Sequence, residues 1–200
     1  NGSESRASAG AAGFDIATGT LMTPEDAIAS SGLSLLLISD AAMAKEGQRL
    51  LGYVPAGATV GLSHGFYLGT GAKIRDDIGV IGVCPKGMGP SVRRLYAQGS
   101  GINTSFAVHQ GGDMDRDMAL GWARALGAPY TFQTTLEHEW KSDIFGERAM
   151  LLGGVHGLVE AAFAWKVNKG TNPSDAYLQV VESIVGPISE TVSARGLIGL

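Results

Sequence analysis

The sequence contains a single cysteine, Cys84, among its 200 residues. A disulfide framework needs at least two cysteines, so the fold is held by other means, and one thiol leaves the redox compartment open. Long apolar runs are also absent: the longest, such as residues 33–38, are far shorter than the roughly 20 residues that cross a bilayer. A disulfide scaffold and a membrane-spanning protein are therefore excluded, and we expect a soluble chain with no membrane partner.

Positive charge is scarce as well. The 15 Lys and Arg residues oppose 19 Asp and Glu, which gives a formal net charge of −4, and the basic residues form no cluster. Nucleic acid is excluded as a partner, because binding phosphates requires concentrated Lys and Arg. Hydrophobic residues make up 44% of the chain and charged residues 17%. This balance is typical of a folded chain, and the length allows one large domain or two small ones.

Short apolar runs alternate with helical patterns as far as residue 136. This alternation is typical of an α/β sheet with buried parallel strands. We expect strands at residues 33–38, 58–62, 78–84, 105–108 and 130–136. We expect helices at 41–51 and 113–126, the second stopped by Gly127 with Pro129 beyond it.

The pattern changes to helical spacing alone between residues 137 and 193. The apolar residues that fall on one stripe of the first helix are Trp140, Ile144, Leu151, Val155 and Leu158. This stripe fits either core packing or the interface with a second copy of the chain. Another helix is expected near Pro173, capped by Asn172 or Ser174. The composition therefore divides the chain near residue 136.

Polar pairs follow four of the expected strands: Ser39-Asp40, Ser63-His64, Pro85-Lys86 and His109-Gln110. In open α/β sheets ligands bind just outside the carboxyl ends of the strands, so these pairs predict a site at one edge. A lysine on a stiff Pro-Lys-Gly turn suits an anionic or carbonyl group. Structural roles stay open for each pair, and Asp40 taken alone is expected to cap the following helix.

Three carboxylates recur every fourth residue at Glu139, Asp143 and Glu147, and on a helix they would share one face. Like charges at this spacing repel, so a divalent cation with oxygen ligands would stabilise them. We call these three residues the acid ladder. From spacing alone a solvated acidic stripe, neutralised by Lys141 and Arg148, explains the ladder as well.

No glycine-rich turn of the dinucleotide-binding kind is present. The segment 87–92 has Val92 where the fingerprint requires its third glycine, and Gly69-Thr70-Gly71 is shorter still. Residues 1–13 lack the basic start and apolar core of a signal peptide, and apolar residues continue to the last position. We expect the chain to be a fragment of a longer protein.

Four ordered segments resemble ketol-acid reductoisomerase, most closely its long, plant-type form. They are Ser-His-Gly-Phe at 63–66, Cys-Pro-Lys-Gly-Met-Gly-Pro-Ser-Val-Arg-Arg-Leu-Tyr at 84–96, Gly-Ile-Asn-Thr-Ser-Phe-Ala-Val-His-Gln at 101–110 and Lys-Ser-Asp-Ile-Phe-Gly-Glu-Arg at 141–148. The resemblance covers nearly the whole chain. It implies the carboxyl-terminal part of an α/β Rossmann-like NADP-binding domain over residues 1–135. The beginning of an all-α, knotted-type helical domain for metal and substrate would follow over 136–200.

The resemblance also implies an activity: Mg²⁺-dependent alkyl migration followed by NADPH reduction. The substrates would be the 2-hydroxy-3-keto acids 2-acetolactate and 2-aceto-2-hydroxybutyrate, converted to 2,3-dihydroxy acids in valine, leucine and isoleucine biosynthesis. NADPH and two Mg²⁺ ions are the implied cofactors, and the implied assembly is a homo-oligomer of at least two copies. The compartment would be the plastid for a plant or algal source and the cytoplasm for a bacterial one.

Carried over residue by residue, the resemblance assigns metal binding to Asp143 and Glu147. It assigns catalytic roles to His64 and Lys86, and to Glu139 as the acid that holds the polar network. The assigned cofactor-binding residues are Ser3, Ser5, Ser39, Asp40 and Gly65. Ser3 and Ser5 match the loop that receives the 2′-phosphate, which favours NADPH over NADH.

The chain also departs from the family. The family's glycine-rich turn and the later helical segment with two further glutamates for the second metal have no counterpart in this sequence. Two other functions therefore stay open. One is a truncated, non-catalytic copy of the enzyme, and the other is an NADP-dependent hydroxyacid dehydrogenase that uses Lys86 without a metal.

Overall fold

The computed structural model describes residues 2–182 and 186. For Gly2, Ser3, Glu147 and Leu151 it describes the backbone alone. The chain forms two compact units, residues 1–141 and residues 142–200, each with its own internal packing. Within the described residues, no helix combines the length and the apolar character needed to cross a bilayer.

Two helices precede the sheet of the first unit, α1 at Gly2–Ala11 and α2 at Pro24–Ala29. Thr23 caps α2, because its hydroxyl oxygen accepts a hydrogen bond of 3.2 Å from the backbone N–H of Asp26. The loop expected at Ser3 and Ser5 is instead the first turn of α1. Ser5 is exposed there, and the side chain of Ser3 lies outside the described part.

A five-stranded sheet forms the centre of the first unit, in the order β1-β2-β3-β4-β5. Its strands are Leu33–Leu36, Thr59–Leu62, Gly79–Pro85, Thr104–Gln110 and Thr131–Gln133. The first three are parallel, but β4 runs antiparallel to β3, and β5 runs parallel to β4. The prediction of five strands is confirmed, whereas the prediction of an all-parallel sheet is wrong for β4 and β5.

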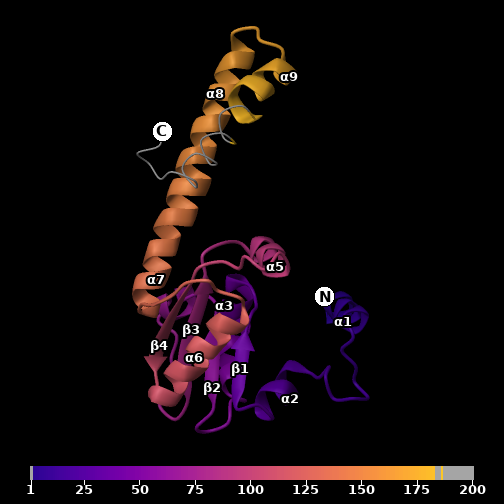
Figure 1. Ribbon diagram of the computed structural model, residues 1–200, viewed down its shortest axis with the longest axis vertical. Helices are drawn as coiled ribbons and strands as arrows, with labels where there is room; N and C mark the ends of the chain where they lie inside the picture. Colours follow the sequence, from indigo (N-terminus) through magenta and orange to yellow (C-terminus); the bar gives the residue numbers. More distant parts are fainter. Residues whose placement is uncertain (1, 183–185, 187–200) are drawn as a thin grey trace. The chain divides into compact units, whose positions relative to one another are not determined.

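Helices cover both faces of this sheet (Figure 1). The helix α3, Asp40–Leu51, contributes to the core on one face through Met43, Leu50 and Leu51. On the other face α6, Asp113–Ala125, packs Ala119 and Ala123 against β3 and β4. Gly127 follows α6 with φ +76°, a conformation that only glycine adopts without strain, and it confirms the predicted stop. Two shorter helices, α4 at Phe66–Gly69 and α5 at Gly89–Ala97, follow β2 and β3.

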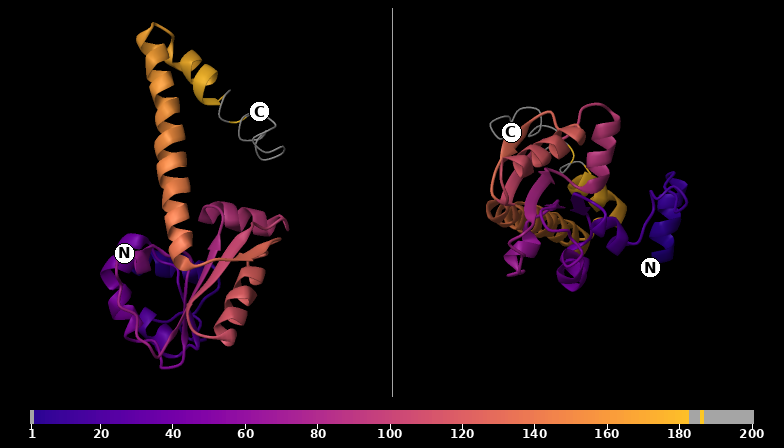
Figure 2. Two further views of the ribbon diagram at one scale, coloured as in Figure 1. Left: turned by 90° about the vertical axis from the view of Figure 1, so that its left-hand side faces the viewer. Right: turned by 90° about the horizontal axis from the view of Figure 1, so that it is seen from below.

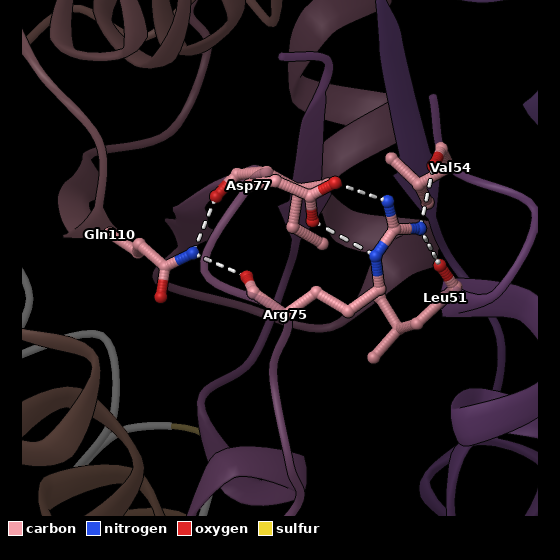
Figure 3. A network of polar contacts seen from close by, with 6 residues as sticks. Leu51, Val54, Arg75, Asp77 and Gln110 are labelled. Carbon is pink, nitrogen blue, oxygen red and sulfur yellow. Dashed lines mark hydrogen bonds and ion pairs between the residues drawn. The ribbon is translucent and has the colours of Figure 1, made fainter. Parts of the chain in front are cut away.

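A polar network ties the loop before β3 to its neighbours (Figure 3). The Arg75 guanidinium donates two hydrogen bonds to the Asp77 carboxylate, 2.9 and 2.6 Å, and a third of 2.8 Å to the carbonyl oxygen of Val54. The Gln110 amide donates to the carbonyl oxygens of Arg75 and Ile78, 2.7 and 2.6 Å. Gln110, at the end of β4, therefore has a structural role, because its amide holds the loop before β3.

The described part of the second unit is helical. It contains η1, a π-helical segment at Ile144–Val155, followed by α8 at His156–Asn168, α9 at Pro173–Ala176 and η2 at Tyr177–Glu182. Figure 2 shows α9 and η2 following the turn at the end of α8. Asn172 caps α9 by accepting a 2.9 Å hydrogen bond from the N–H of Ser174, so of the two expected caps the structure uses Asn172. The apolar stripe is exposed at Val155 and Leu158, with 46% and 72% of their surface accessible.

Protonation of Asp77 is expected to loosen the network of Figure 3. The Arg75 hydrogen bonds hold the pKa of Asp77 below its ordinary value. The stabilisation is therefore present above the ordinary pKa of the unfolded chain and is lost as pH falls through the lower, folded pKa. Thermal unfolding of the full-length protein and its Asp77→Asn variant should give a Tm difference at neutral pH that vanishes once the pH has fallen below the lowered pKa of Asp77.

Asp76→Asn is the control for this prediction, because it removes the same charge from the neighbouring exposed position. Asp77 is also exposed, so about 1 M salt should reduce the Tm difference by screening. A difference between Asp77→Asn and the parent that stays constant from neutral to acidic pH would contradict the prediction.

Candidate active site

The turn after β2 fixes the imidazole of His64. The chain passes from Leu62 through Ser63, His64 and Gly65 into α4, and the backbone N–H of Phe66 donates a 3.1 Å hydrogen bond to Nδ1 of His64. Because Nδ1 accepts, a neutral His64 carries its proton on Nε2. The half-buried ring is thereby oriented as a hydrogen-bond donor at its outer nitrogen.

Glu139 is the buried member of the acid ladder, with 3% of its surface accessible. It lies on α7, Leu136–Asp143. Its Oε2 accepts a 3.0 Å hydrogen bond from the backbone N–H of Gly65, and its Oε1 lies 3.5 Å from Nζ of Lys86. A buried carboxylate requires such partners, since leaving water costs several kcal/mol otherwise. The interpretation of the ladder as a solvated stripe is therefore wrong for Glu139.

Lys86 follows β3 and keeps its backbone in the sheet. Its N–H donates a 2.9 Å hydrogen bond to the carbonyl oxygen of Asn103, just before β4 begins. The Lys86 side chain is 39% exposed, whereas that of its partner Glu139 is 2% exposed. The ammonium is thus anchored on one side by a buried charge and open to solvent on the other, an arrangement that suits binding of an anionic oxygen.

Trp140 packs α7 against the turn that carries His64. The sequence pattern had placed Trp140 on the apolar stripe and had given it no role in the site. Its indole lies edge-on to Phe66, with ring centroids 6.2 Å apart at 72°. It also covers Gly65 and Gly69, where a Cβ would come within 3.2 and 2.7 Å of indole carbons. The two glycines, four residues apart, were the signal in the sequence for this close approach.

The other two residues of the acid ladder, Asp143 and Glu147, lie at the end of α7 and in η1. Ligand atoms of His64 and Glu139 lie within 4.8 Å of one another, and Asp143 is the last residue of α7, four residues after Glu139. Glu147 follows in η1, and its side chain lies outside the described part of the chain. Lys141 does not neutralise the ladder in this structure, because its Nζ pairs with Oε1 of Glu137 at 2.6 Å. That hydrogen bond lowers the pKa of Glu137.

The donor chemistry separates these residues by role. Both oxygens of Glu139 face donors, and Nδ1 of His64 already accepts a hydrogen bond, so neither suits a magnesium ion. Asp143 offers a half-buried carboxylate on the same helix, and carboxylate oxygens are the ligands that Mg²⁺ prefers. The residues present therefore fit a magnesium ion through Asp143 rather than through Glu139 or His64.

Two sequence predictions for this edge of the sheet need correction. The pair His109-Gln110 ends β4, which runs antiparallel, so it lies at the opposite edge from His64 and Lys86, where Gln110 faces Val80. Asp40 is the first residue of α3 rather than its cap. The cap is Ser39, whose hydroxyl oxygen accepts a 3.3 Å hydrogen bond from the N–H of Ala42.

A pocket of about 570 Å³ opens beyond the carboxyl ends of β1, β2 and β3. Leu37, Ser63 and Pro85, which follow or end these strands, form one side of it. Residues of α5 and of the end of α6 form the other, among them Tyr96 and Trp122. The pocket thus lies where open α/β sheets bind ligands.

Comparison with known proteins gives consistent relatives over the whole chain. The model of the acetohydroxy acid isomeroreductase NADPH-binding domain matches residues 1–131, and that of the ketol-acid reductoisomerase C-terminal domain matches residues 136–200. Chloroplastic ketol-acid reductoisomerases of Spinacia oleracea and Pisum sativum are 51% and 49% identical, over 100% of this chain and over 35% and 36% of their own lengths. The chain therefore spans about a third of these relatives.

A solved structure shows the same similarity in three dimensions. An NADH-preferring ketol-acid reductoisomerase from an uncultured archean superimposes with a TM-score of 0.87 and 26% identity. The match covers 98% of this chain and 59% of that one. The Rossmann-like cofactor-binding fold followed by a helical segment is thus confirmed.

Replacing Gly65 by alanine tests the close approach of α7 to the His64 turn. The added Cβ would overlap the carbonyl oxygen of Leu136, so the turn and α7 would have to separate. We expect a loss of about 2–4 kcal/mol of unfolding free energy, measured by urea denaturation of the full-length protein. Gly121→Ala on α6 is the control, because its Cβ would meet nothing within 4 Å. Similar effects of the two substitutions would contradict the prediction.

Proposed function

The chain belongs to the ketol-acid reductoisomerase family, and we propose that the protein containing it converts 2-acetolactate or 2-aceto-2-hydroxybutyrate to 2,3-dihydroxy acids with NADPH and Mg²⁺. The observation that carries this proposal is the buried Glu139 carboxylate, which joins the His64 turn to Lys86. Residues 1–135 would serve cofactor binding, and residues 136–200 would begin the helical metal and substrate domain.

Lys86 and His64 would act on the oxygens of the substrate. The ammonium of Lys86 favours negative charge on an oxygen, and Glu139 holds it in place without neutralising its exposed side. His64 presents an N–H at Nε2, which can donate to a substrate oxygen or to a water molecule. A 2-hydroxy-3-keto acid has carboxylate, hydroxyl and carbonyl oxygens, so these two donors match its chemistry.

Asp143 and Glu147 would hold magnesium. When bound, the metal supplies polarisation of the substrate carbonyl and hydroxyl oxygens, which favours alkyl migration. Two ions are expected from the family resemblance, with further ligands from beyond this chain. Glu139 is paired with Lys86 and with Gly65, so we assign it to the polar network rather than to the metal.

Ser3 and Ser5 support NADPH over NADH, because serine hydroxyls can donate to a 2′-phosphate. Ser39, Asp40 and Gly65 would lie on the cofactor side of the site. Both cofactors occur among the matches: the family model is described as NADPH-binding, whereas the archaeal structure is described as NADH-preferring and a relative from Desulfosudis oleivorans, 35% identical, is named for NAD(+). Family membership alone therefore does not decide the preference, and we infer NADPH from Ser3 and Ser5.

The compartment would be the plastid if the source is a plant or an alga, as the two chloroplastic relatives suggest. A bacterial source would place the protein in the cytoplasm. The exposed apolar residues Val155 and Leu158 support an oligomer of at least two copies, in which such a surface would be covered.

Replacing Asp143 by asparagine tests the metal assignment. The substitution keeps the size of the side chain and removes the charge, so the affinity of the full-length protein for Mg²⁺ should fall about tenfold or more. Titration calorimetry with MgCl₂ measures this directly. Asp117→Asn, an exposed aspartate on α6, is the matched control. Unchanged Mg²⁺ affinity would overturn the assignment, and equal turnover of acetolactate in excess EDTA would favour the metal-independent dehydrogenase.

Glu139→Gln separates positioning of Lys86 from metal binding. Glutamine can still accept the hydrogen bond of Gly65 but no longer attracts the ammonium. We expect kcat to fall about 10 to 100-fold while Mg²⁺ affinity and Tm stay near those of the parent. Steady-state kinetics, calorimetry and thermal unfolding provide the three readouts. A loss of Mg²⁺ affinity as large as that of Asp143→Asn would show that Glu139 is a metal ligand instead.

A further inference from the structure

The side chains of the short helix α4 have two different sets of neighbours. Tyr67 and Leu68 pack against one cluster of the hydrophobic core. Among the described residues, the two core clusters include neither Phe66, the first residue of α4, nor Trp140 of α7. These two rings instead meet edge to face, with centroids 6.2 Å apart. Packing of the core therefore does not account for this aromatic pair.

Phe66 contacts the imidazole of His64 in two ways. Its backbone N–H donates to Nδ1 at 3.1 Å, and its ring centroid lies 6.2 Å from that of the imidazole, with the planes tilted by 51°. Any residue except proline would supply the N–H, so only the ring contact depends on the phenylalanine side chain. The outer torsion of histidine has a broad energy minimum, and a second contact restricts rotation of the ring more than one hydrogen bond does. The Phe66 side chain therefore limits the direction in which the Nε2–H of His64 points.

Consecutive residues of α7 hold consecutive residues of the turn after β2. Glu139 accepts the hydrogen bond from the N–H of Gly65, and Trp140 packs its indole against the ring of Phe66. An edge-to-face pair at this separation is favourable beyond the burial of its surface, and it restricts the rotation of both rings. The position of the Phe66 ring is therefore determined by α7.

We propose that Phe66 and Trp140 are positioning residues for the reaction. Phe66 fixes the orientation of the His64 imidazole, and Trp140 acts through Phe66 by fixing its ring. The helix α7 thus positions both donors of the site, Lys86 through the charge of Glu139 and His64 through the aromatic pair. The inference rests on the proposed function in taking His64 to act on a substrate oxygen.

Replacing Phe66 by leucine removes the flat ring and keeps the backbone N–H and an apolar side chain. In the full-length protein kcat for acetolactate should fall about tenfold while KM stays within about twofold of the parent, because orientation matters most in the transition state. Phe132→Leu is the matched control, since that ring, in β5, stacks on Tyr130 with centroids 6.0 Å apart and should leave kcat unchanged. An unchanged kcat in Phe66→Leu would overturn the proposal.

A double-mutant cycle separates positioning of His64 from a general effect on the fold. His64→Gln removes the imidazole, so adding Phe66→Leu to that variant should lower kcat no further. If Phe66→Leu lowers kcat by the same factor with and without the imidazole, Phe66 acts independently of His64 and the proposal is wrong.

Substitutions at Trp140 test the second step. Trp140→Leu should lower kcat about as much as Phe66→Leu does, and the double variant should be no slower than either single variant. Trp140→Phe keeps an aromatic edge for Phe66 and should recover most of the kcat that Trp140→Leu loses. Equal kcat values for Trp140→Phe and Trp140→Leu would rule out a role for the aromatic contact.

Chemical labelling tests the same contact without turnover. Diethyl pyrocarbonate acylates neutral imidazoles that solvent reaches, and His64 is half-buried whereas His109 on β4 is exposed. In Phe66→Leu and in Trp140→Leu, His64 should be labelled about threefold faster than in the parent, because the imidazole samples more open orientations. His109 should react at its parent rate, and peptide mass spectrometry measures both positions.

Unchanged labelling of His64 in both variants would show that the aromatic pair does not hold the imidazole. If the parent fails to convert acetolactate, the proposed function is wrong, and the labelling rates still decide whether Phe66 and Trp140 fix His64.

Discussion

The polar site of the first unit depends on one buried carboxylate. Glu139 is almost inaccessible to water, and its two oxygens face the N–H of Gly65 and the ammonium of Lys86. A charge removed from water must keep such partners, so the position of α7 determines where the turn after β2 and the turn after β3 can lie. The polar site is in this sense a consequence of satisfying one acid.

Small side chains make that burial possible. Gly65 lets its own backbone approach Leu136, and Gly69 leaves room for the indole of Trp140. Leu136 in turn packs over Gly82 in the middle of β3. The sheet, the short helix α4 and the first turn of α7 are thus joined by contacts that a methyl group at any of these glycines would disturb.

Much of the fold followed from local patterns in the sequence. Apolar runs located all five strands, and Gly127 and Asn172 marked a helix end and a helix start, because these features depend on a few neighbouring residues. The direction in which a strand runs in the sheet does not depend on neighbouring residues alone. An apolar run reads the same whichever way it enters the sheet, so the reversal of β4 was missed and Gln110 was placed at the wrong edge. For the same reason His64, Lys86 and Glu139 could be named as candidates, but the contacts that join them, and the packing of Trp140 against the His64 turn, required the tertiary structure.

The reversal of β4 has an evolutionary consequence. The chain leaves β3 at Pro85 and returns at Thr104 to the same edge of the sheet, closed at its base by the hydrogen bond from Lys86 to Asn103. The segment that contains α5 is therefore a loop whose two ends, Pro85 and Thr104, are paired in the sheet. Insertions or deletions near Gly99 can change its length without moving a strand or the lysine, because closing a longer surface loop costs little. Related proteins can therefore change α5, which forms one side of the pocket, while β3, β4 and Lys86 stay in place.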